Sequence, residues 1–342
     1  MEKERNGNQP HPSLEQARID KLYMRRCLQL ARCGERGAPP NPMVGAVIVY
    51  KDRIIGEGYH IRCGEAHAEV NAVHSVKEKD RILLPQSTIY VSLEPCAHYG
   101  KTPPCAELLV RTGFQRVVIG CLDPFSRVSG RGAEILRKAG MEVCVGVLEK
   151  ECRELNRRFI TFHEKGRPYI TLKWAASRDG YIDRWRELNN GKPIEAPAKL
   201  STPETQVSVH HIRAKHQAIL VGHRTLLLDR PQLNLRYWAG KDPQKIVLGH
   251  LSEKELPAGW QAYADIDTLI VALRKQGVQS LLVEGGTHTL QTFIDAGLWD
   301  EAQEELSAVS LASGVPAPKM PRGVERTTEC KCDVFFNRWK NE

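Results

Sequence analysis

Three potential metal ligands, one imidazole and two thiols, stand at element boundaries that a fold must bring together. His67 opens a predicted helix, Cys96 follows a run typical of a buried strand, and Cys105 begins another predicted helix. Three protein ligands leave the fourth position of a tetrahedral Zn²⁺ open for water, which is typical of catalytic rather than structural zinc. The positive end of a helix also favours the thiolate form of Cys105. The pattern therefore predicts a catalytic zinc site at a meeting point of two helix starts and one strand end.

A carboxylate stands close to the first ligand. Glu69, two residues after His67, is placed to reach a metal-bound water and to move its proton. The order H-x-E, then P-C and a second Cys, is similar to the signature of zinc nucleobase deaminases, in which two residues separate the cysteines. Here eight residues separate Cys96 from Cys105. The order and separation of these motifs favour a functional over an accidental interpretation.

Strands and helices alternate through the first half of the chain, after an initial hairpin. This alternation predicts a three-layer α/β domain with a mixed sheet. The elements expected are helix 20–35, strands 43–50 and 54–60, helix 67–78, strand 87–95, helix 105–113, strand 116–124, helix 132–140, strand 141–149 and helix 151–166.

The Gly-Arg-Pro stretch at 166–168 marks the boundary to a second α/β domain. With about 150 residues per domain, 342 residues suggest two domains. We expect a disordered lead-in at 1–18, one domain at 19–165 and another at 166–342. In the second domain the patterns predict strand 169–177, a loop over 183–199, helix 201–215, strands 216–222 and 245–250, helix 265–277, strand 280–286, helix 287–297 and a final strand within 304–311.

Composition limits the classes of protein that need to be considered. Hydrophobic residues make up 41% and charged residues 26%, which excludes a disordered or fibrous protein. No run of 18 apolar residues and no apolar leader is present, so we expect a cytoplasmic protein without a membrane partner. The net charge is +8, and basic and acidic residues are interspersed along the chain. This favours a mixed solvated surface over a nucleic-acid-binding patch.

The residues alone leave two alternatives open. One is a nucleoside or RNA deaminase with an unrelated second domain, which would be expected to show a stronger basic patch and C-x-x-C spacing. The other is a zinc-stabilised binding or scaffold protein, which would need a fourth protein ligand beside His67, Cys96 and Cys105.

The motifs taken together resemble the bifunctional riboflavin-biosynthesis deaminase/reductase family. PNPMVGAVIV, HAEVNA, YVSLEPCAHYGKTPPC and DPFSRVSGRG resemble its deaminase half, over residues 20–165. RPYITLKWAASRDGYID, STPETQ, IRAKHQAILVG, LLLDRPQLNLR and SLLVEGGTHTLQTFIDAGL resemble its reductase half, over residues 167–310. The order of the two halves is also the family's arrangement.

The resemblance implies a fold and two successive reactions. The first domain is expected to be cytidine-deaminase-like and to deaminate a phosphoribosylamino-diaminopyrimidinone with one Zn²⁺. The second is expected to be dihydrofolate-reductase-like and to reduce the ribosyl group to ribityl with NADPH. The expected partners are phosphorylated pyrimidines, with no nucleic acid, and the chain is expected to form a homo-oligomer. A deaminase with a degenerate reductase domain remains an alternative.

The resemblance also assigns residues to roles. In the first domain it implies zinc ligands His67, Cys96 and Cys105, the proton shuttle Glu69, and substrate contacts Asn41, His98 and Lys101. In the second it implies cofactor contacts Ala175, Thr225, Asp229, Gly286 and Thr287, and substrate contacts Arg213, Leu233, Arg236 and Glu284. The chain departs from the family at Arg230, at Lys199 and in a shorter segment between Lys245 and Val283.

Overall fold

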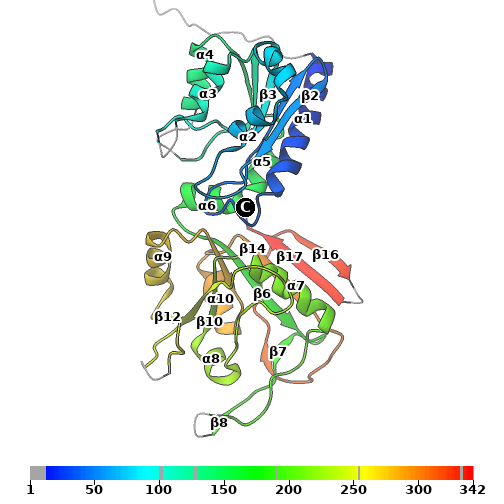
Figure 1. Ribbon diagram of the computed structural model, residues 1–342. Helices are drawn as coiled ribbons and strands as arrows, with labels where there is room; N and C mark the ends of the chain where they lie inside the picture. Colours follow the sequence, from blue (N-terminus) through cyan, green and yellow to red (C-terminus); the bar gives the residue numbers. More distant parts are fainter. Residues whose placement is uncertain are drawn as a thin grey trace, which may run out of the picture. The chain divides into compact units, whose positions relative to one another are not determined.

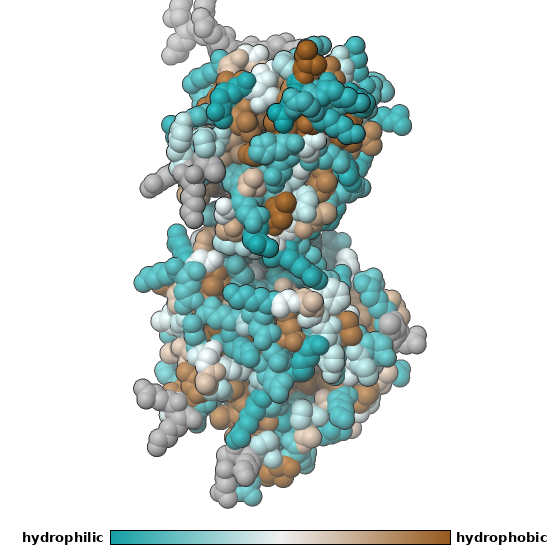
Figure 2. Space-filling model, in the orientation of Figure 1, coloured by the Kyte–Doolittle hydropathy of each residue, from teal (hydrophilic) through white to brown (hydrophobic). Residues whose placement is uncertain are grey.

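The chain divides into two compact units, with the boundary after Glu164. Figure 1 shows their helices and strands in a computed structural model, which describes residues 13–99, 103–125, 130–189, 192–252, 255–331 and 334–341. Within these residues, no helix combines the length and the apolar character that crossing a membrane requires. On the face drawn in Figure 2, apolar residues are scattered among hydrophilic ones, as the interspersed charges led us to expect.

A mixed sheet of five strands forms the centre of the first unit, and this confirms the sheet type predicted from the sequence. The strand order is β2-β1-β3-β4-β5, in which β1 is antiparallel to both neighbours and β3, β4 and β5 are parallel. The strands are β1 (Gly45–Tyr50), β2 (Arg53–Tyr59), β3 (Thr88–Leu93), β4 (Arg116–Cys121) and β5 (Glu142–Val145).

Helices cover both faces of this sheet, because its strands are apolar on both sides. Along β1, Ala46 and Ile48 pack into one core cluster with α2, α3 and α4, and Val47 and Val49 pack into another with α1 and α5. The first unit therefore has the expected three layers. Its helices are α1 (Leu14–Arg32), α2 (Ala68–Ser75), α3 (Cys105–Thr112), α4 (Arg131–Lys138), α5 (Glu149–Leu155) and α6 (Arg157–Lys165), with a 3₁₀ helix η1 (Glu78–Gln86).

Two helices differ from the sequence-based expectation. The lead-in expected over 1–18 contains the start of α1, because Ser13 caps the helix by accepting the backbone N–H of Gln16 at 3.1 Å. Residues 1–12 lie outside the described residues. The helix expected over 151–166 is divided at Asn156, whose side chain bonds to the backbone of Met43.

The second unit contains a sheet of eight strands in the order β12-β11-β10-β13-β6-β14-β17-β16. The six strands from β12 to β14 are parallel, and β17 and β16 extend the sheet in antiparallel fashion. The strands are β6 (Tyr169–Ala176), β10 (Ala218–Gly222), β11 (Gln244–Leu248), β12 (Trp260–Tyr263), β13 (Ser280–Val283), β14 (Glu301–Leu306), β16 (Arg326–Lys331) and β17 (Val334–Lys340).

The end of this sheet departs from the prediction. The final strand expected within 304–311 stops at Leu306, and β16 and β17 follow it. Every residue of β16 is exposed, so its sequence carries no apolar signal of a strand. The loop expected over 183–199 contains the two-residue strands β8 (Leu188–Asn189) and β9 (Lys192–Pro193). A further small pair joins β7 (Tyr181–Asp183) to β15 (Val315–Pro316).

The strand β6 presents opposite faces to the two helical layers of the second unit. Ile170, Leu172 and Trp174 pack in the main core with residues of α9 and α10, whereas Thr171 faces the other way and bonds to His216, just beyond α7. Successive side chains along a β-strand point to opposite faces of the sheet, which explains this division. The helices of this unit are α7 (Pro203–Ala214), α8 (His223–Asp229), α9 (Ile266–Lys275) and α10 (Thr287–Asp295).

Candidate functional site

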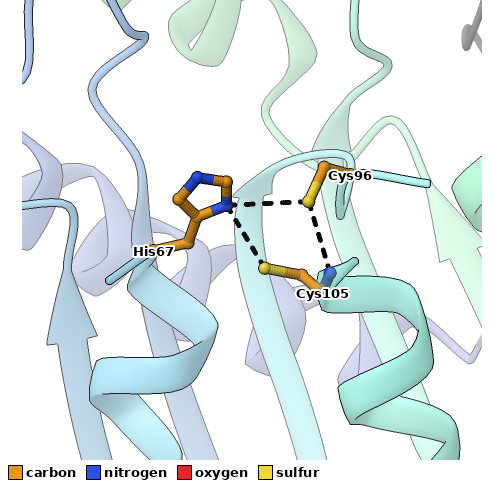
Figure 3. Close-up of side chains that lie close together, drawn as sticks. All are labelled: His67, Cys96 and Cys105. Atoms are coloured by element: carbon orange, nitrogen blue, oxygen red, sulfur yellow. Dashed lines mark hydrogen bonds between the residues drawn. The ribbon is translucent and has the colours of Figure 1, made fainter. Parts of the chain in front are cut away.

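The three predicted metal ligands converge in the first unit (Figure 3). His67 caps the N-terminus of α2, Cys96 follows β3, and Cys105 is the first residue of α3. The Nδ1 atom of His67 lies 3.6 Å from the Sγ of Cys96 and 3.3 Å from the Sγ of Cys105. The backbone N–H of Cys105 donates to the Sγ of Cys96 at 3.2 Å. All three ligand atoms lie within 4.8 Å of one another.

This arrangement fits a zinc ion. Bonds of about 2.0–2.3 Å to a tetrahedral zinc place neighbouring donor atoms roughly 3.5 Å apart, close to the separations seen here. One imidazole and two thiols are also donors that zinc prefers. Hydrogen bonds from the Cys105 thiol, His67 and the Cys105 backbone lower the pKa of Cys96, against the opposing effect of burial. The geometry thus favours the thiolate form of Cys96, whereas the hydrogen bond to Cys96, followed by burial, raises the pKa of the Cys105 thiol.

Glu69 is a buried carboxyl group beside the three ligands. It lies in the first turn of α2 and is 3% exposed. Burial, followed by the negative charge of Cys96, raises the pKa of Glu69 to about 7. A carboxyl group with a pKa near neutrality accepts and releases a proton readily, which is the property required of a proton shuttle.

Asn41 is linked to the zinc-ligand residue His67 through His60. The sequence analysis did not single out His60. The Nδ2 of Asn41 lies 3.1 Å from the Nε2 of His60, and the Nδ1 of His60 lies 3.1 Å from the carbonyl oxygen of Ala66. A carbonyl oxygen requires a donor, so Nδ1 carries the proton and Nε2 accepts from Asn41. The rings of His60 and His67 meet edge to face with centroids 5.3 Å apart. The sequence offered no signal for His60, which ends the predicted strand 54–60.

Glu94 is a second residue that the sequence analysis missed. Its carboxylate accepts three backbone N–H groups, from Asp123 at 3.1 Å, Gly130 at 2.9 Å and Ala133 at 3.1 Å. Glu94 is 4% exposed and stands two residues before Cys96. It therefore joins the segment carrying a zinc ligand to the start of α4. The motif SLEPC does not by itself reveal this role, because a carboxylate at a strand end can equally face solvent.

Of the other two predicted deaminase contacts, His98 is described and Lys101 lies outside the described residues. His98 is exposed, and the centroid of its ring lies 6.4 Å from that of Phe125. The ring of Phe125 meets the ring of His163 on α6 edge to face at 5.3 Å. His98 therefore adjoins Phe125, which itself packs against α6.

In the second unit, the structure pairs two predicted substrate residues with each other. The guanidinium of Arg213 on α7 donates to both carboxylate oxygens of Glu284, at 2.8 and 2.6 Å. Burial opposes ionisation of Glu284, but the charge and hydrogen bonds of Arg213, with the charge of Lys173, hold its pKa below its usual range. The pair is thus a largely buried, bidentate ion pair at the end of β13.

The other two predicted substrate residues lie on one short segment. Leu233 is 3% exposed, adopts a left-handed backbone (φ 50°) and packs against Ile219, Val221 and Leu282. Arg236 is exposed, and its guanidinium donates to the side-chain oxygens of Gln232 at 2.8 Å and Asn234 at 2.7 Å. Leu233 thus anchors the segment in the core, and Arg236 presents a cation at its surface.

Three of the five predicted cofactor residues lie around the start of α10. Gly286 caps this helix and Thr287 is its first residue. A Cβ atom added at Gly286 would lie 3.3 Å from the Oγ1 of Thr225, so these two positions adjoin. Ala175 is half-buried in β6 and pairs with Glu305 of β14. Backbone N–H groups at a helix start suit a phosphate group.

Asp229 has a partner that the sequence analysis did not anticipate. It ends α8 and forms an ion pair with Arg186, a buried residue of the loop before β8. Arg186 also pairs with Asp183. Arg230, the departure noted in this motif, caps α8 in a left-handed conformation (φ 41°). The carboxylate of Asp229 is therefore held by a cation of its own unit.

Comparisons with known proteins match both halves of the chain. The model of the cytidine and deoxycytidylate deaminase zinc-binding region matches residues 17–121, and the RibD C-terminal domain matches residues 168–304. The riboflavin biosynthesis protein RibD of Aquifex aeolicus is 37% identical over 315 residues, which cover 82% of this chain and 85% of the relative. RibD of Bacillus amyloliquefaciens is 35% identical over 341 residues, covering 89% and 88%.

Solved structures match over almost the whole chain. A diaminohydroxyphosphoribosylaminopyrimidine deaminase/5-amino-6-(5-phosphoribosylamino)uracil reductase from Thermotoga maritima gives a TM-score of 0.83 at 32% identity, covering 96% of this chain and 100% of the other. RibD of Acinetobacter baumannii gives a TM-score of 0.81 at 29% identity, with the same coverage. The comparisons confirm two α/β units, the first with a cytidine-deaminase zinc-binding region and the second a RibD C-terminal domain.

Proposed function

The chain belongs to the RibD family of bifunctional riboflavin-biosynthesis enzymes, which join a deaminase to a reductase, and we propose substrates and residue roles for its two reactions. The first unit hydrolytically deaminates a diaminopyrimidinone that carries a phosphoribosylamino group. The second unit reduces the ribosyl group of the deaminated product to ribityl with NADPH. The observation that carries the first step is the convergence of His67, Cys96 and Cys105 beside the buried Glu69.

In the deaminase, His67, Cys96 and Cys105 hold one zinc ion, which when bound lowers the pKa of a water molecule and supplies a nucleophile near neutral pH. Glu69 accepts the proton of the attacking water and delivers it to the departing amino group. Its buried position beside the ligands, where it interacts with Cys105, places it to carry out both tasks. The side chain of Asn41, oriented by His60, binds the pyrimidine ring. His98 and Lys101 contact the substrate beyond the ring.

In the reductase, the residues around the start of α10 bind NADPH, which when bound supplies a hydride to the sugar carbon. Gly286 and Thr287 offer backbone N–H groups to its phosphates, and Thr225, beside Gly286, contacts the same cofactor. Ala175 and Asp229 complete the cofactor contacts. The pairing of Asp229 with Arg186 keeps this carboxylate in place for a hydrogen-bonding role.

The substrate of the reductase lies against Arg213, Leu233, Arg236 and Glu284 in this proposal. Arg236 is the exposed cation of the four and suits the phosphate, because a guanidinium pairs bidentately with phosphate oxygens. Glu284, held by Arg213, offers acceptors for hydroxyl groups of the sugar chain. Leu233 fixes the segment that carries Arg236.

A coupled assay tests both halves. The pyrimidine substrate is supplied with and without NADPH, and ammonia release and NADPH oxidation are followed together. We expect ammonia in both samples, and NADPH oxidation only after deamination. Adding the deaminated ribosyl compound directly should give NADPH oxidation without ammonia. Ammonia release without NADPH oxidation or NADPH binding would instead identify a deaminase with a degenerate reductase unit.

The partners follow from the same proposal. Phosphorylated pyrimidines are the ligands, and nucleic acid is not a substrate, since the positive charge of the chain is interspersed with negative charge. The homo-oligomer and the cytoplasmic location expected from the sequence stay predictions. Light scattering on the purified chain measures the first, and fractionation of cells measures the second.

A further inference from the structure

His210 is a buried histidine of α7 that faces the segment carrying Arg236. Its side chain lies three residues before Arg213 on the same helix and is 2% exposed. The Nδ1 atom accepts the backbone N–H of Arg236 at 2.9 Å and lies 3.5 Å from the backbone nitrogen of Tyr237. The Tyr237 ring meets the imidazole edge to face with centroids 4.9 Å apart. One buried ring thus holds the backbone of the residue proposed to bind the substrate.

The direction of the Arg236 side chain depends on the backbone of its segment. The Arg236 guanidinium bonds to Gln232 and Asn234, which belong to the same segment. The segment is fixed to the rest of the unit by Leu233 in the core, by a hydrogen bond from the Leu235 N–H to Asp242 at 2.8 Å, and by His210. The bond to His210 is the anchor at Arg236 itself.

The same helix also fixes the second part of the proposed substrate site. Residues three apart on a helix share a face, so His210 and Arg213 point to the same side of α7. Arg213 holds Glu284 at the end of β13. The helix α7 therefore contacts both the backbone of Arg236, through His210, and Glu284, through Arg213.

The bond to Arg236 requires one protonation state of His210. A ring nitrogen that accepts an N–H must be unprotonated, so the neutral ring carries its proton on Nε2. Burial, followed by the positive charges of Arg213 and Arg236, lowers the pKa of His210, against the opposing charges of Glu284 and Asp242. Protonation at Nδ1 would place a donor against a donor and break the bond.

We propose that His210 is a positioning residue of the reductase: in its neutral form it holds the Arg236 backbone, and so aligns the Arg236 guanidinium with the phosphate of the substrate. The inference rests on the proposed substrate role of Arg236. His210 touches neither substrate nor cofactor in this proposal and acts through Arg236.

Two substitutions at His210 separate a positioning role from a structural one. In His210→Asn the Oδ1 atom takes the place of Nδ1, so the acceptor is retained, whereas in His210→Gln the amide lies one bond further out. Gln favours a helix more than Asn does, so a purely structural role would make His210→Gln the milder change. We expect the reverse: KM for the deaminated substrate rises about tenfold in His210→Gln and stays within about twofold in His210→Asn. The turnover number changes little in both.

The pH dependence of KM provides a second measurement. As the pH falls through the lowered pKa of His210, KM of the wild-type chain should rise, and this rise should be smaller in His210→Asn. The raised pKa of Arg213 keeps it charged over this range, and the low pKa of Glu284 keeps it ionised. The substrate phosphate titrates near pH ~6 but does so equally in both proteins. The difference between the two profiles therefore isolates His210.

NADPH affinity is measured in each variant as a check on the fold of the second unit, and it should be unchanged. If His210→Gln loses NADPH affinity, the comparison of wild type with His210→Asn across pH decides the question. Equal KM values in both variants, or coincident pH profiles for wild type and His210→Asn, overturn the inference alone. A wild-type chain that neither binds nor oxidises NADPH overturns the proposed function together with it.

Discussion

Asn156 and Met43 form a closed pair of hydrogen bonds across 113 residues of sequence. The Oδ1 of Asn156 accepts the Met43 backbone N–H at 2.8 Å, and its Nδ2 donates to the Met43 carbonyl at 2.9 Å. Asn156 is 3% exposed and occupies the break between α5 and α6. Met43 lies two residues beyond Asn41, so the break in the helix supports the segment that we propose to orient the pyrimidine ring.

Replacing Asn156 should therefore weaken substrate binding in the deaminase. Asn156→Ala removes two buried hydrogen bonds and should cost about 2–3 kcal/mol of stability. KM for the diaminopyrimidinone should rise, while zinc content stays at one per chain, because the ligands belong to other segments. Steady-state kinetics and metal analysis on the same sample check this. An unchanged KM would show that Asn41 is positioned by other contacts.

Removal of either thiol should remove the metal. Cys96→Ser and Cys105→Ser each leave two ligands of the three, so both variants should lose zinc and deaminase activity. Metal content after dialysis is the measurement. Cys27→Ser serves as the matched control, since Cys27 is buried in the core cluster of α1, away from the three ligands. Full zinc occupancy in either ligand variant contradicts the assignment.

Glu69→Gln should retain zinc but lose deamination by roughly 10²–10⁴-fold, because an amide cannot accept the proton of the attacking water. Circular dichroism and zinc content verify the fold, and ammonia release measures activity. The neighbouring reductase activity, measured with the deaminated substrate, acts as an internal standard for protein amount. Near-normal turnover would place the proton shuttle on another residue.

Acid should destabilise the first unit through Asp20. Burial opposes ionisation of Asp20, but hydrogen bonds from Arg116, Gln16 and Tyr90 and the charge of Arg116 lower its pKa below the usual value. A lowered pKa in the folded state gives stability that is present above about pH 4 and is lost as the pH falls through the folded pKa. Urea unfolding at a series of pH values should show this loss.

The matched variant for this test is Asp20→Asn. Arg116 is 8% exposed but keeps a second partner in Glu142 at 2.6 Å, so the variant should lose about 1–2 kcal/mol of stability near neutral pH. The acid-dependent part of the stability should be smaller in the variant than in wild type. Parallel pH profiles for the two proteins would assign the acid sensitivity to other carboxylates.

The sequence predicted the deaminase unit well because its signals are local. A few neighbouring residues are enough to predict an apolar strand such as Arg116–Cys121. The same holds for the motif that begins at His67. Helix ends were less predictable: Ser13 begins α1 within a polar stretch, and Asn156 divides a helix by a contact with Met43 that no local pattern encodes. The exposed strand β16 likewise depends on pairing with β17.

Residues of the site that act through distant contacts were the ones missed. His60, Glu94 and His210 each hold the backbone or side chain of another residue far along the chain. Nothing in their immediate sequence distinguishes them from histidines and glutamates in other roles. Arg213 and Glu284 were assigned by resemblance, but their mutual pairing became visible only in three dimensions.

The separate anchoring of the two thiols has a consequence for how such an enzyme changes over evolution. Cys96 is held at the end of β3 and Cys105 at the start of α3, and the N–H···S bond between them sets their spacing. None of the three predicted ligands lies among the eight residues between them. We therefore expect insertions and substitutions in this segment to change substrate preference more than they change metal binding by His67, Cys96 and Cys105.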